Sequence, residues 1–300
     1  MLTRRRALLA GLGGLAVVAA GGGGAYALVE TDVLPGRVRL DRTLGRCGAL
    51  PAPPPQTAAV HEARYRSKRR RTEVGWSLVH PSGHPLRGLP VAVVLHGLGG
   101  DHASAVADLA LDHYLGQAMA RGVPPFALLT VDGGGTYWHR RASGDDPVAM
   151  VTDELLPHLR RLGLRTGPAD RIGLYGYSMG GYGALLAAER LGPARVAAVA
   201  AASPALFASY DAARGADSGA FDDAADFARN DVMRALPRLR AIPAWVGCGR
   251  SDVFTEATER IRRRLTAPRG GISPGCHDTS YWRRTLPDVL AFLGRHLGGR

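Results

Sequence analysis

The stretch Leu174-Tyr-Gly-Tyr-Ser178-Met-Gly-Gly-Tyr-Gly183 decides the fold. It contains the pattern G-x-S-x-G, in which a strand turns sharply into a helix and the serine stands at the apex with its hydroxyl exposed. Small residues two places before and after the serine let the two backbones approach closely. Residues 171–175 form a short apolar run typical of a buried strand, and residues 184–191 are strong helix formers. The sequence therefore predicts a nucleophile at Ser178.

Strand-like and helix-like segments alternate on both sides of this turn. Alternation of this kind predicts an α/β fold with a mostly parallel, doubly wound sheet in a single domain. Residues 89–96 are apolar on both faces, as expected for a strand covered by helices on two sides. The predicted strands are 61–67, 73–80, 89–96, 126–131, 171–175, 196–202 and 242–247. The predicted helices are 101–121, 147–162, 184–191, 221–228, 231–239, 253–265 and 281–297.

The first 59 residues are expected to lie outside this domain. Thr3-Arg-Arg-Arg-Ala-Leu-Leu9 resembles a twin-arginine export motif, and an uncharged stretch follows over residues 7–29. Because this stretch contains four consecutive glycines and ends in Ala25-Tyr-Ala27, residues 1–29 are predicted to be a cleaved signal peptide, with an uncleaved membrane anchor as the alternative. Residues 30–59, with Pro51-Ala-Pro-Pro-Pro55, are predicted to be a stiff tether. The domain would then span residues 60–300, outside the cell or at the cell envelope.

The composition argues against several classes of function. The formal net charge is +12, but Lys68 is the only lysine among 38 basic residues, and the one dense basic run, residues 64–71, contains a single aromatic residue. Nucleic-acid binding is therefore not expected, and contact with an anionic envelope surface is favoured over it. The ten histidines form no H-E-x-x-H motif, and Asp132-Gly-Gly-Gly135 lacks the lysine of a phosphate loop. We expect no metal and no bound cofactor.

Two of the three cysteines are predicted to lie near the serine. Cys248 and Cys276 both fall on loops at the expected active-site edge, which suggests a disulfide between them with Cys47 left over. Three unpaired thiols are the alternative.

A serine needs a histidine to take its proton and a carboxylate to hold that histidine in the right tautomer. In hydrolases of this strand–helix pattern, the acid and then the histidine follow the serine on later loops. Asp252 follows the strand ending at residue 247, where it could also cap the next helix. Glu256 and Glu259 are weaker candidates because they fall within that helix. His277 lies on a glycine- and proline-containing loop before the last helix, with Asp278 beside it as a loop or cap residue.

The reaction also needs two donors for an oxyanion. The N–H of Met179, just after the nucleophile, is the first. The second is expected from residues 96–100, His-Gly-Leu-Gly-Gly, with the Leu98 N–H preferred and Gly97 or Gly99 as alternatives. His96 itself is interpreted as a residue at the edge of the core rather than as a base.

Four motifs together resemble the esterase family related to esterase D (S-formylglutathione hydrolase) and the mycolyltransferases, within the α/β-hydrolases. They are Leu-His-Gly-Leu-Gly-Gly (95–100), Gly-Tyr-Ser-Met-Gly-Gly-Tyr-Gly (176–183), Cys-Gly-Arg-Ser-Asp (248–252) and His-Asp-Thr-Ser-Tyr-Trp-Arg (277–283). The resemblance implies the α/β-hydrolase fold and a triad of Ser178, Asp252 and His277. It also suggests that residues 132–138 and 143–146 line the substrate site. Mycolyltransferases have a glutamate at the acid position and a long lipid groove, and this chain has Asp252 and no insertion to form one.

The predicted substrate-binding residues are Gly97, Asp132, Tyr137, Trp138 and Trp282. The last three could stack on a sugar, but packing in the core explains them equally well. The preferred function is an exported serine esterase acting on a small-molecule or lipid ester. The alternatives are an acyltransferase that passes an acyl group to a sugar or another envelope hydroxyl, and a non-catalytic binding protein on a hydrolase scaffold.

Overall fold

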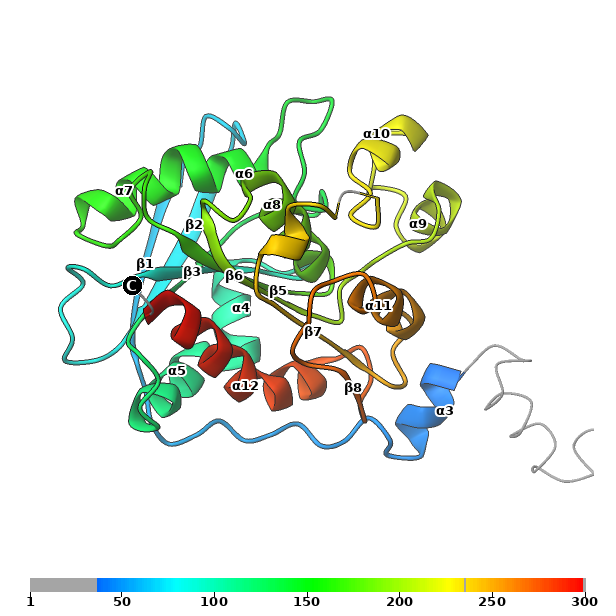
Figure 1. Ribbon diagram of the computed structural model, residues 1–300, viewed down its shortest axis with the longest axis horizontal. Coiled ribbons are helices and arrows are strands. Elements are labelled where there is room, and N and C mark those ends of the chain that lie inside the picture. Colours follow the sequence, from blue (N-terminus) through cyan, green and yellow to red (C-terminus); the bar gives the residue numbers. More distant parts are fainter. Residues whose placement is uncertain (1–36, 235, 299–300) are drawn as a thin grey trace, which may run out of the picture.

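An eight-stranded sheet runs through the centre of the protein (Figure 1). The structure is a computed structural model that describes residues 37–234 and 236–298. The strand order is β1-β2-β4-β3-β5-β6-β7-β8, antiparallel where β2 pairs with β1 and β4 and parallel elsewhere. The predicted single-domain α/β-hydrolase fold is thereby confirmed. The strands are β1 (Ala59–Arg66), β2 (Glu73–His80), β3 (Val91–Leu95), β4 (Ala127–Val131), β5 (Ile172–Tyr177), β6 (Val196–Ala202), β7 (Ala244–Gly249) and β8 (Ile272–Ser273).

Helices cover both faces of the sheet. Figure 1 shows α6, α7 and α8 on one side, and α4, α5 and α12 on the other. The helices are α3 (Arg37–Thr43), α4 (His102–Leu109), α5 (Leu111–Ala120), α6 (Pro147–Ala149), the π-helix η1 (Met150–Leu155), α7 (Leu156–Arg161), α8 (Met179–Leu191), α9 (Tyr210–Ala216), α10 (Ala224–Arg229), the 3₁₀ turn η2 (Leu239–Ala241), α11 (Thr255–Arg262) and α12 (Thr279–Gly298).

The central strand β3 shows why the sheet needs two helical layers. All five of its residues are buried. Val91, Val93 and Leu95 join the core beneath α8, while Ala92 and Val94 join the core beneath α12. Because successive side chains of a strand point to opposite faces, an uninterrupted apolar run is stable only where both faces are covered.

The structure differs from the sequence prediction in several helices. The predicted helix 101–121 is two helices, because Ala110 adopts a left-handed conformation with φ of 50° and ends α4. The described residues 231–234 and 236–238 of the predicted helix 231–239 are not helical. Its last residue, Leu239, begins the 3₁₀ turn η2. Helix α9 and the two-residue strand β8 were not predicted. Helix α9 begins at a local cap, in which the Ser209 side chain accepts a hydrogen bond from the Ala212 N–H.

Residues 44–58 lie along the domain, in the part of the predicted tether that the structure describes. The carbonyl oxygen of Pro51 accepts a hydrogen bond from the Arg283 guanidinium at 3.3 Å, and the Ala58 N–H donates to the carbonyl of Asp112 at 2.9 Å. Figure 1 shows this segment running below α5 and α12. Residues 1–36, including the predicted signal peptide or anchor, lie outside the described residues. Within residues 37–234 and 236–298, no helix is both long and apolar enough to cross a bilayer.

The disulfide joins Cys47 to Cys276, with the two Cα atoms 4.8 Å apart. The hypothesis of a Cys248–Cys276 bridge is therefore wrong. Cys248 is a buried free thiol at the end of β7, with its Sγ 4.0 Å from the Ser203 hydroxyl, and burial raises its pKa to about 12. Cys276 is instead bonded to Cys47, which precedes β1 in the chain. The sequence does not show that residues 44–58 lie along α12.

Reducing this disulfide is expected to lower the thermal stability. It closes a loop between residues 229 positions apart, and releasing a native loop of this kind costs roughly 2–5 kcal/mol. We expect dithiothreitol to lower the Tm by roughly 5–15 °C in a calorimetric scan. Cys47→Ala is the matched control, because its Tm should not respond to the reductant. An unchanged wild-type Tm, with three reactive thiols before reduction, would contradict the assigned pairing.

The close approach of backbones at the turn between β5 and α8 predicts a severe effect of Gly180→Ala. A Cβ at Gly180 would overlap the carbonyl oxygen of Leu95, a backbone atom that cannot move aside without shifting β3. We expect a loss of more than about 4 kcal/mol in the free energy of unfolding, measured in urea. Gly215→Ala is the control, since nothing lies within 4 Å of its added Cβ and the substitution in α9 should be neutral or stabilising by up to about 1 kcal/mol. Equal stabilities would show that the contact is not tight.

Candidate active site

Ser178 stands at the apex of the turn between β5 and α8. Its backbone has φ of 57° and ψ of −124°, a conformation that non-glycine residues rarely adopt. The surrounding chain holds it there, because the Ser178 N–H donates to the carbonyl of Ala202 at 3.0 Å and its own carbonyl accepts from Ala205 N–H at 3.0 Å. The strained conformation presents the side chain at the edge of the sheet where the parallel strands end.

The structure brings Ser178, His277 and Asp252 together. The His277 Nε2 atom lies 2.8 Å from the Ser178 hydroxyl oxygen, and the His277 Nδ1 atom lies 2.9 Å from an oxygen of Asp252. Asp252 follows β7, and His277 follows β8 and precedes α12. Since parallel strands end at the same edge of a sheet, three loops far apart in the sequence meet at one point.

The carboxylate of Asp252 is buried and held in its ionised form. Burial raises its pKa, but the hydrogen bond and charge of His277, together with hydrogen bonds from Phe254 and Ser203, outweigh burial and leave the pKa below its usual range. The Phe254 N–H donates to the second carboxylate oxygen at 2.9 Å. An ionised Asp252 accepts a hydrogen bond from the Nδ1–H of His277, which keeps the ring proton on Nδ1 and leaves Nε2 free to accept the proton of Ser178.

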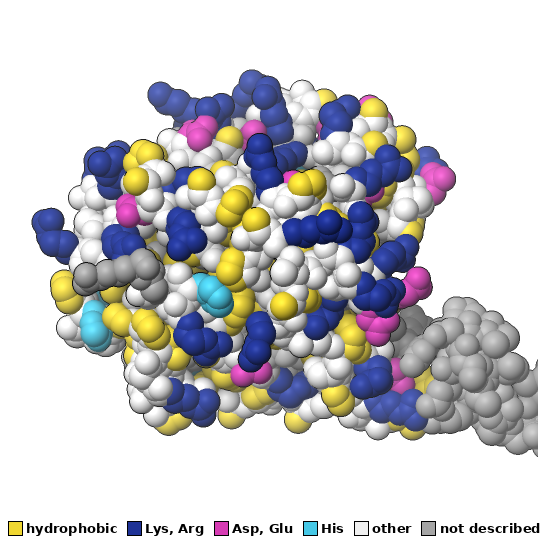
Figure 2. Space-filling model, viewed as in Figure 1, with side chains coloured by type: hydrophobic (Ala, Val, Ile, Leu, Met, Phe, Trp, Pro, Cys, Tyr) yellow, Lys and Arg dark blue, Asp and Glu magenta, His cyan; other side chains and the backbone are white. Residues whose placement is uncertain are grey.

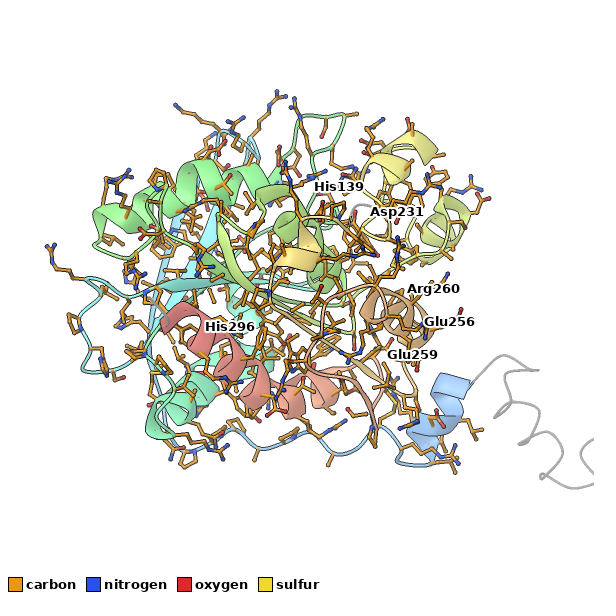
Figure 3. All side chains as sticks on the ribbon, in the orientation of Figure 1. His139, Asp231, Glu256, Glu259, Arg260 and His296 are labelled. Carbon is orange, nitrogen blue, oxygen red and sulfur yellow. A yellow bond between two sulfur atoms is a disulfide. The ribbon has the colours of Figure 1, made fainter. Side chains whose placement is uncertain are left out.

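The other acidic candidates point elsewhere. Glu256 and Glu259 lie on α11, where they pair with Arg260 at 3.3 Å and Arg263 at 3.8 Å (Figure 3). The Glu256 side chain is 87% exposed. Asp278 accepts a hydrogen bond from the Tyr281 N–H at 3.0 Å, which is the capping arrangement expected for it.

The sequence profile of a family described as "Putative esterase" matches residues 67–293. The chain belongs to this family. It is therefore an esterase with the α/β-hydrolase fold. A search among curated protein sequences finds no match.

Several solved structures share the fold of this esterase. A ferulic acid esterase is 19% identical with a TM-score of 0.69, and the alignment covers 80% of this chain and 99% of the other. The S-formylglutathione hydrolase of Agrobacterium tumefaciens is 16% identical with a TM-score of 0.65, covering 81% and 96%. FphF of Staphylococcus aureus, a fluorophosphonate-binding serine hydrolase, is 17% identical with a TM-score of 0.64, covering 79% and 99%.

Two aromatic side chains lie against His277, and two exposed apolar residues are neighbours in sequence of residues at this site. The rings of Trp282 and Phe254 lie 5.4 Å and 5.3 Å from the His277 ring, measured between centroids. Leu98 and Val253 are 53% and 67% exposed, unusually so for large apolar residues. The sequence analysis did not predict Val253 and Phe254 as residues of the site. Their position directly after Asp252 could have indicated that they lie beside it. These four residues, Leu98, Val253, Phe254 and Trp282, are called the apolar rim below, and a surface of this kind suits a ligand with an apolar part.

Two of the predicted substrate-binding residues lie behind this rim. The Trp138 side chain is 0% exposed and belongs to the core, and Tyr137 beside it is also buried. The Asp132 carboxylate accepts hydrogen bonds from the backbone N–H groups of Gly75 and His102, each at 2.8 Å. Gly97, in contrast, borders the nucleophile, since a Cβ added to it would lie 3.4 Å from the Cβ of Ser178.

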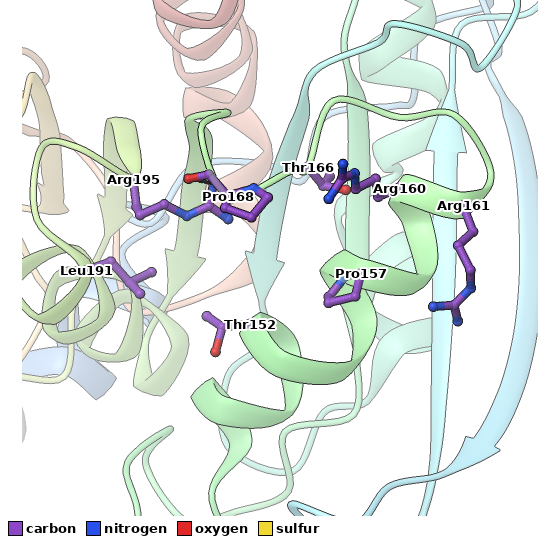
Figure 4. A pocket seen from close by; sticks show the side chains of 8 residues that line it. All are labelled: Thr152, Pro157, Arg160, Arg161, Thr166, Pro168, Leu191 and Arg195. Carbon is purple, nitrogen blue, oxygen red and sulfur yellow. Dashed lines mark hydrogen bonds between the residues drawn. The ribbon is translucent and has the colours of Figure 1, made fainter.

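Four surface hollows lined by described residues contain none of Ser178, His277 and Asp252. One of about 660 Å³ lies beside α7 (Figure 4). It is lined by Thr152, Pro157, Arg160, Arg161, Thr166, Pro168, Leu191 and Arg195.

The face seen in Figure 2 carries basic side chains spread widely over it rather than gathered in one stripe.

Proposed function

We propose that this chain is an exported serine ester hydrolase that acts through Ser178, His277 and Asp252 and forms an acyl-enzyme. The observation that carries the proposal is the continuous set of hydrogen bonds from the serine hydroxyl through both imidazole nitrogens to a buried carboxylate. A serine hydroxyl becomes an effective nucleophile when such a base removes its proton as the bond to carbon forms.

The reaction follows from these positions. The Ser178 hydroxyl attacks the ester carbonyl while its proton passes to Nε2 of His277, and the N–H groups of Met179 and Leu98 donate to the oxyanion. The imidazolium then gives this proton to the departing alkoxide, which leaves as the alcohol. Water attacks the acyl-enzyme in the same way, with His277 again as base, and releases the acid and the free serine.

The open position of the histidine favours hydrolysis over acyl transfer. The His277 side chain is 24% exposed, so water can reach the base that activates it. The apolar rim with Leu98 and Val253 supports an ester with an apolar acyl or alcohol group. The names of the structural neighbours cover both a ferulic acid ester and a thioester of formate, and therefore do not choose a substrate.

Export is supported by two independent features. The basic and uncharged stretches of residues 1–29 have the pattern of an export signal. The Cys47–Cys276 disulfide is of the kind that persists in an oxidising compartment outside the cytoplasm.

The test uses the purified full chain, wild type and Ser178→Ala, with p-nitrophenyl esters from acetate to palmitate, each with and without glucose. We expect wild-type hydrolysis that is unaffected by glucose and that falls by about 10⁶-fold in the variant. Ester cleavage that rises with glucose and yields acylated sugar would make the protein an acyltransferase. If both proteins are inert and a fluorophosphonate fails to label Ser178, the non-catalytic binding function replaces the enzymatic one.

A further inference from the structure

His96 is a buried imidazole that the reaction does not use as a base. Its side chain lies between two glycine-rich loops, residues 97–100 and 132–135. We propose that His96 is a positioning residue that aims the Leu98 N–H at the oxyanion. This inference rests on the proposed function, because it assigns a role within the same reaction.

The hydrogen bonds of His96 define its tautomer. The Gly133 N–H donates to Nε2 at 2.9 Å, so Nε2 carries no proton. The proton of the neutral ring is then on Nδ1, which lies 2.7 Å from the carbonyl oxygen of Gly97 and donates to it. Burial lowers the pKa of His96 and keeps the ring neutral. A neutral His96 therefore pulls the Gly97 carbonyl inward.

The position of that carbonyl decides where the next N–H points. In a trans peptide the C=O and the following N–H point in opposite directions, so the Leu98 N–H is directed away from His96. The Gly97 carbonyl also accepts from Gly100 N–H at 3.1 Å, in a turn that needs the positive φ of 77° at Gly99. Within the described residues the Leu98 N–H makes no hydrogen bond. It is a free donor on a loop that borders Ser178.

Trp138 fixes His96 from the other side. Its indole N–H donates to the carbonyl of His96 at 3.2 Å, and the two rings meet edge to face at 5.1 Å. Tyr137 and Trp138 have positive φ values of 52° and 58°, two consecutive left-handed residues that turn the indole into the core. Gly183 on α8 leaves the room for it, since a Cβ there would lie 2.6 Å from the indole. This explains why Trp138 is buried and does not line the substrate site.

Two isosteric substitutions of His96 separate this role from a merely structural one. In His96→Asn the amide nitrogen can take the place of Nδ1 and still donate to Gly97. In His96→Gln the amide reaches the place of Nε2, which preserves the contact with Gly133 but removes the donor to Gly97. Removing one oxyanion donor typically lowers kcat by about 10²- to 10³-fold. We expect about a 10²-fold lower kcat in His96→Gln with KM changed less than about 3-fold, and a kcat in His96→Asn within about 10-fold of wild type.

Each outcome has a defined meaning. An unchanged kcat in His96→Gln, or equal losses in both variants that follow their Tm values, would overturn the proposal. If both variants fail to fold, Trp138→Phe removes the indole donor together with part of a buried ring, and it should lower kcat by about 3- to 10-fold at constant KM. An unchanged kcat in that variant would count against the proposal.

The tautomer provides a readout that does not depend on activity. Nitrogen-15 NMR of the wild-type protein, assigned by difference with the variant spectra, should show His96 with the proton on Nδ1. A proton on Nε2 would overturn the proposal even in an active enzyme. An inert wild type that retains the Nδ1–H tautomer would instead refute the proposed function and leave the structural arrangement intact.

Discussion

Ser178→Ala is expected to lower kcat by about 10⁶-fold, because all later steps depend on the covalent intermediate. The variant keeps Met179 and the loop that carries Leu98, so residual catalysis over water should remain through the oxyanion donors. KM should change little, since the hydroxyl contributes mainly in the transition state. Active-site titration of the wild type with a fluorophosphonate sets the concentration of sites. The same reagent should leave the variant unlabelled.

The strained backbone at Ser178 adds a second expectation. Glycine adopts the observed φ of 57° and ψ of −124° without the cost of about 1–3 kcal/mol that a side chain incurs there. Glycine normally destabilises a structured position by about 0.5–1 kcal/mol relative to alanine. We therefore expect Ser178→Gly to reverse this order and unfold at a higher urea concentration than Ser178→Ala, while both are inactive.

Urea unfolding of the two variants measures this difference directly. Neither variant has the hydroxyl that bonds to His277, so the comparison isolates the backbone. A lower midpoint for Ser178→Gly would show that the turn is not strained. Activity retained in either variant would remove Ser178 from the nucleophile position.

The parts of the fold that were predictable are those that local sequence patterns determine. The sharp turn at Ser178 requires the glycines on either side of it, because a Cβ at Gly176 would meet the backbone of α8 and a Cβ at Gly180 would meet the backbone of β3. The apolar runs of β3, β4 and β6 could be recognised because both of their faces are buried. Asp252 and His277 were found from the order of loops after the serine, and the structure brings both to it.

The parts that were not predictable depend on contacts between distant segments. No local pattern places Cys47 beside Cys276, because that contact requires residues 44–58 to lie along α12. Tyrosine and tryptophan at positions 137 and 138 look the same in a substrate site and in a core. Both residues adopt a left-handed backbone, which buries Trp138 against His96. Tyrosine and tryptophan rarely adopt this conformation, so nothing in the sequence predicts it there.

Asp252→Asn is expected to lower kcat by about 10⁴-fold with little change in KM. The asparagine amide can donate to Nδ1 of His277, which moves the ring proton to Nε2, where it blocks acceptance of the serine proton. Fluorophosphonate labelling should slow to a similar extent. Glu256→Gln and Asp278→Asn are the matched controls, because the first carboxylate is exposed on α11 and the second caps α12. Both should retain kcat within a few-fold of wild type.

Asp252→Asn also tests the electrostatic interaction between Asp252 and His277. The pKa of Asp252 is below its usual range in the folded protein, so the stability from its ionised form is present above about pH 4 and is lost as the pH falls through the lower, folded-state pKa. Wild-type urea midpoints should therefore fall more steeply below pH 4 than those of Asp252→Asn, which has no carboxyl group at this position. Parallel pH curves would mean that Asp252 is not held ionised by His277. A kcat loss equal to that of Glu256→Gln would remove Asp252 from the triad, because an acid that orients the catalytic histidine cannot be neutralised without changing the tautomer on which proton transfer depends.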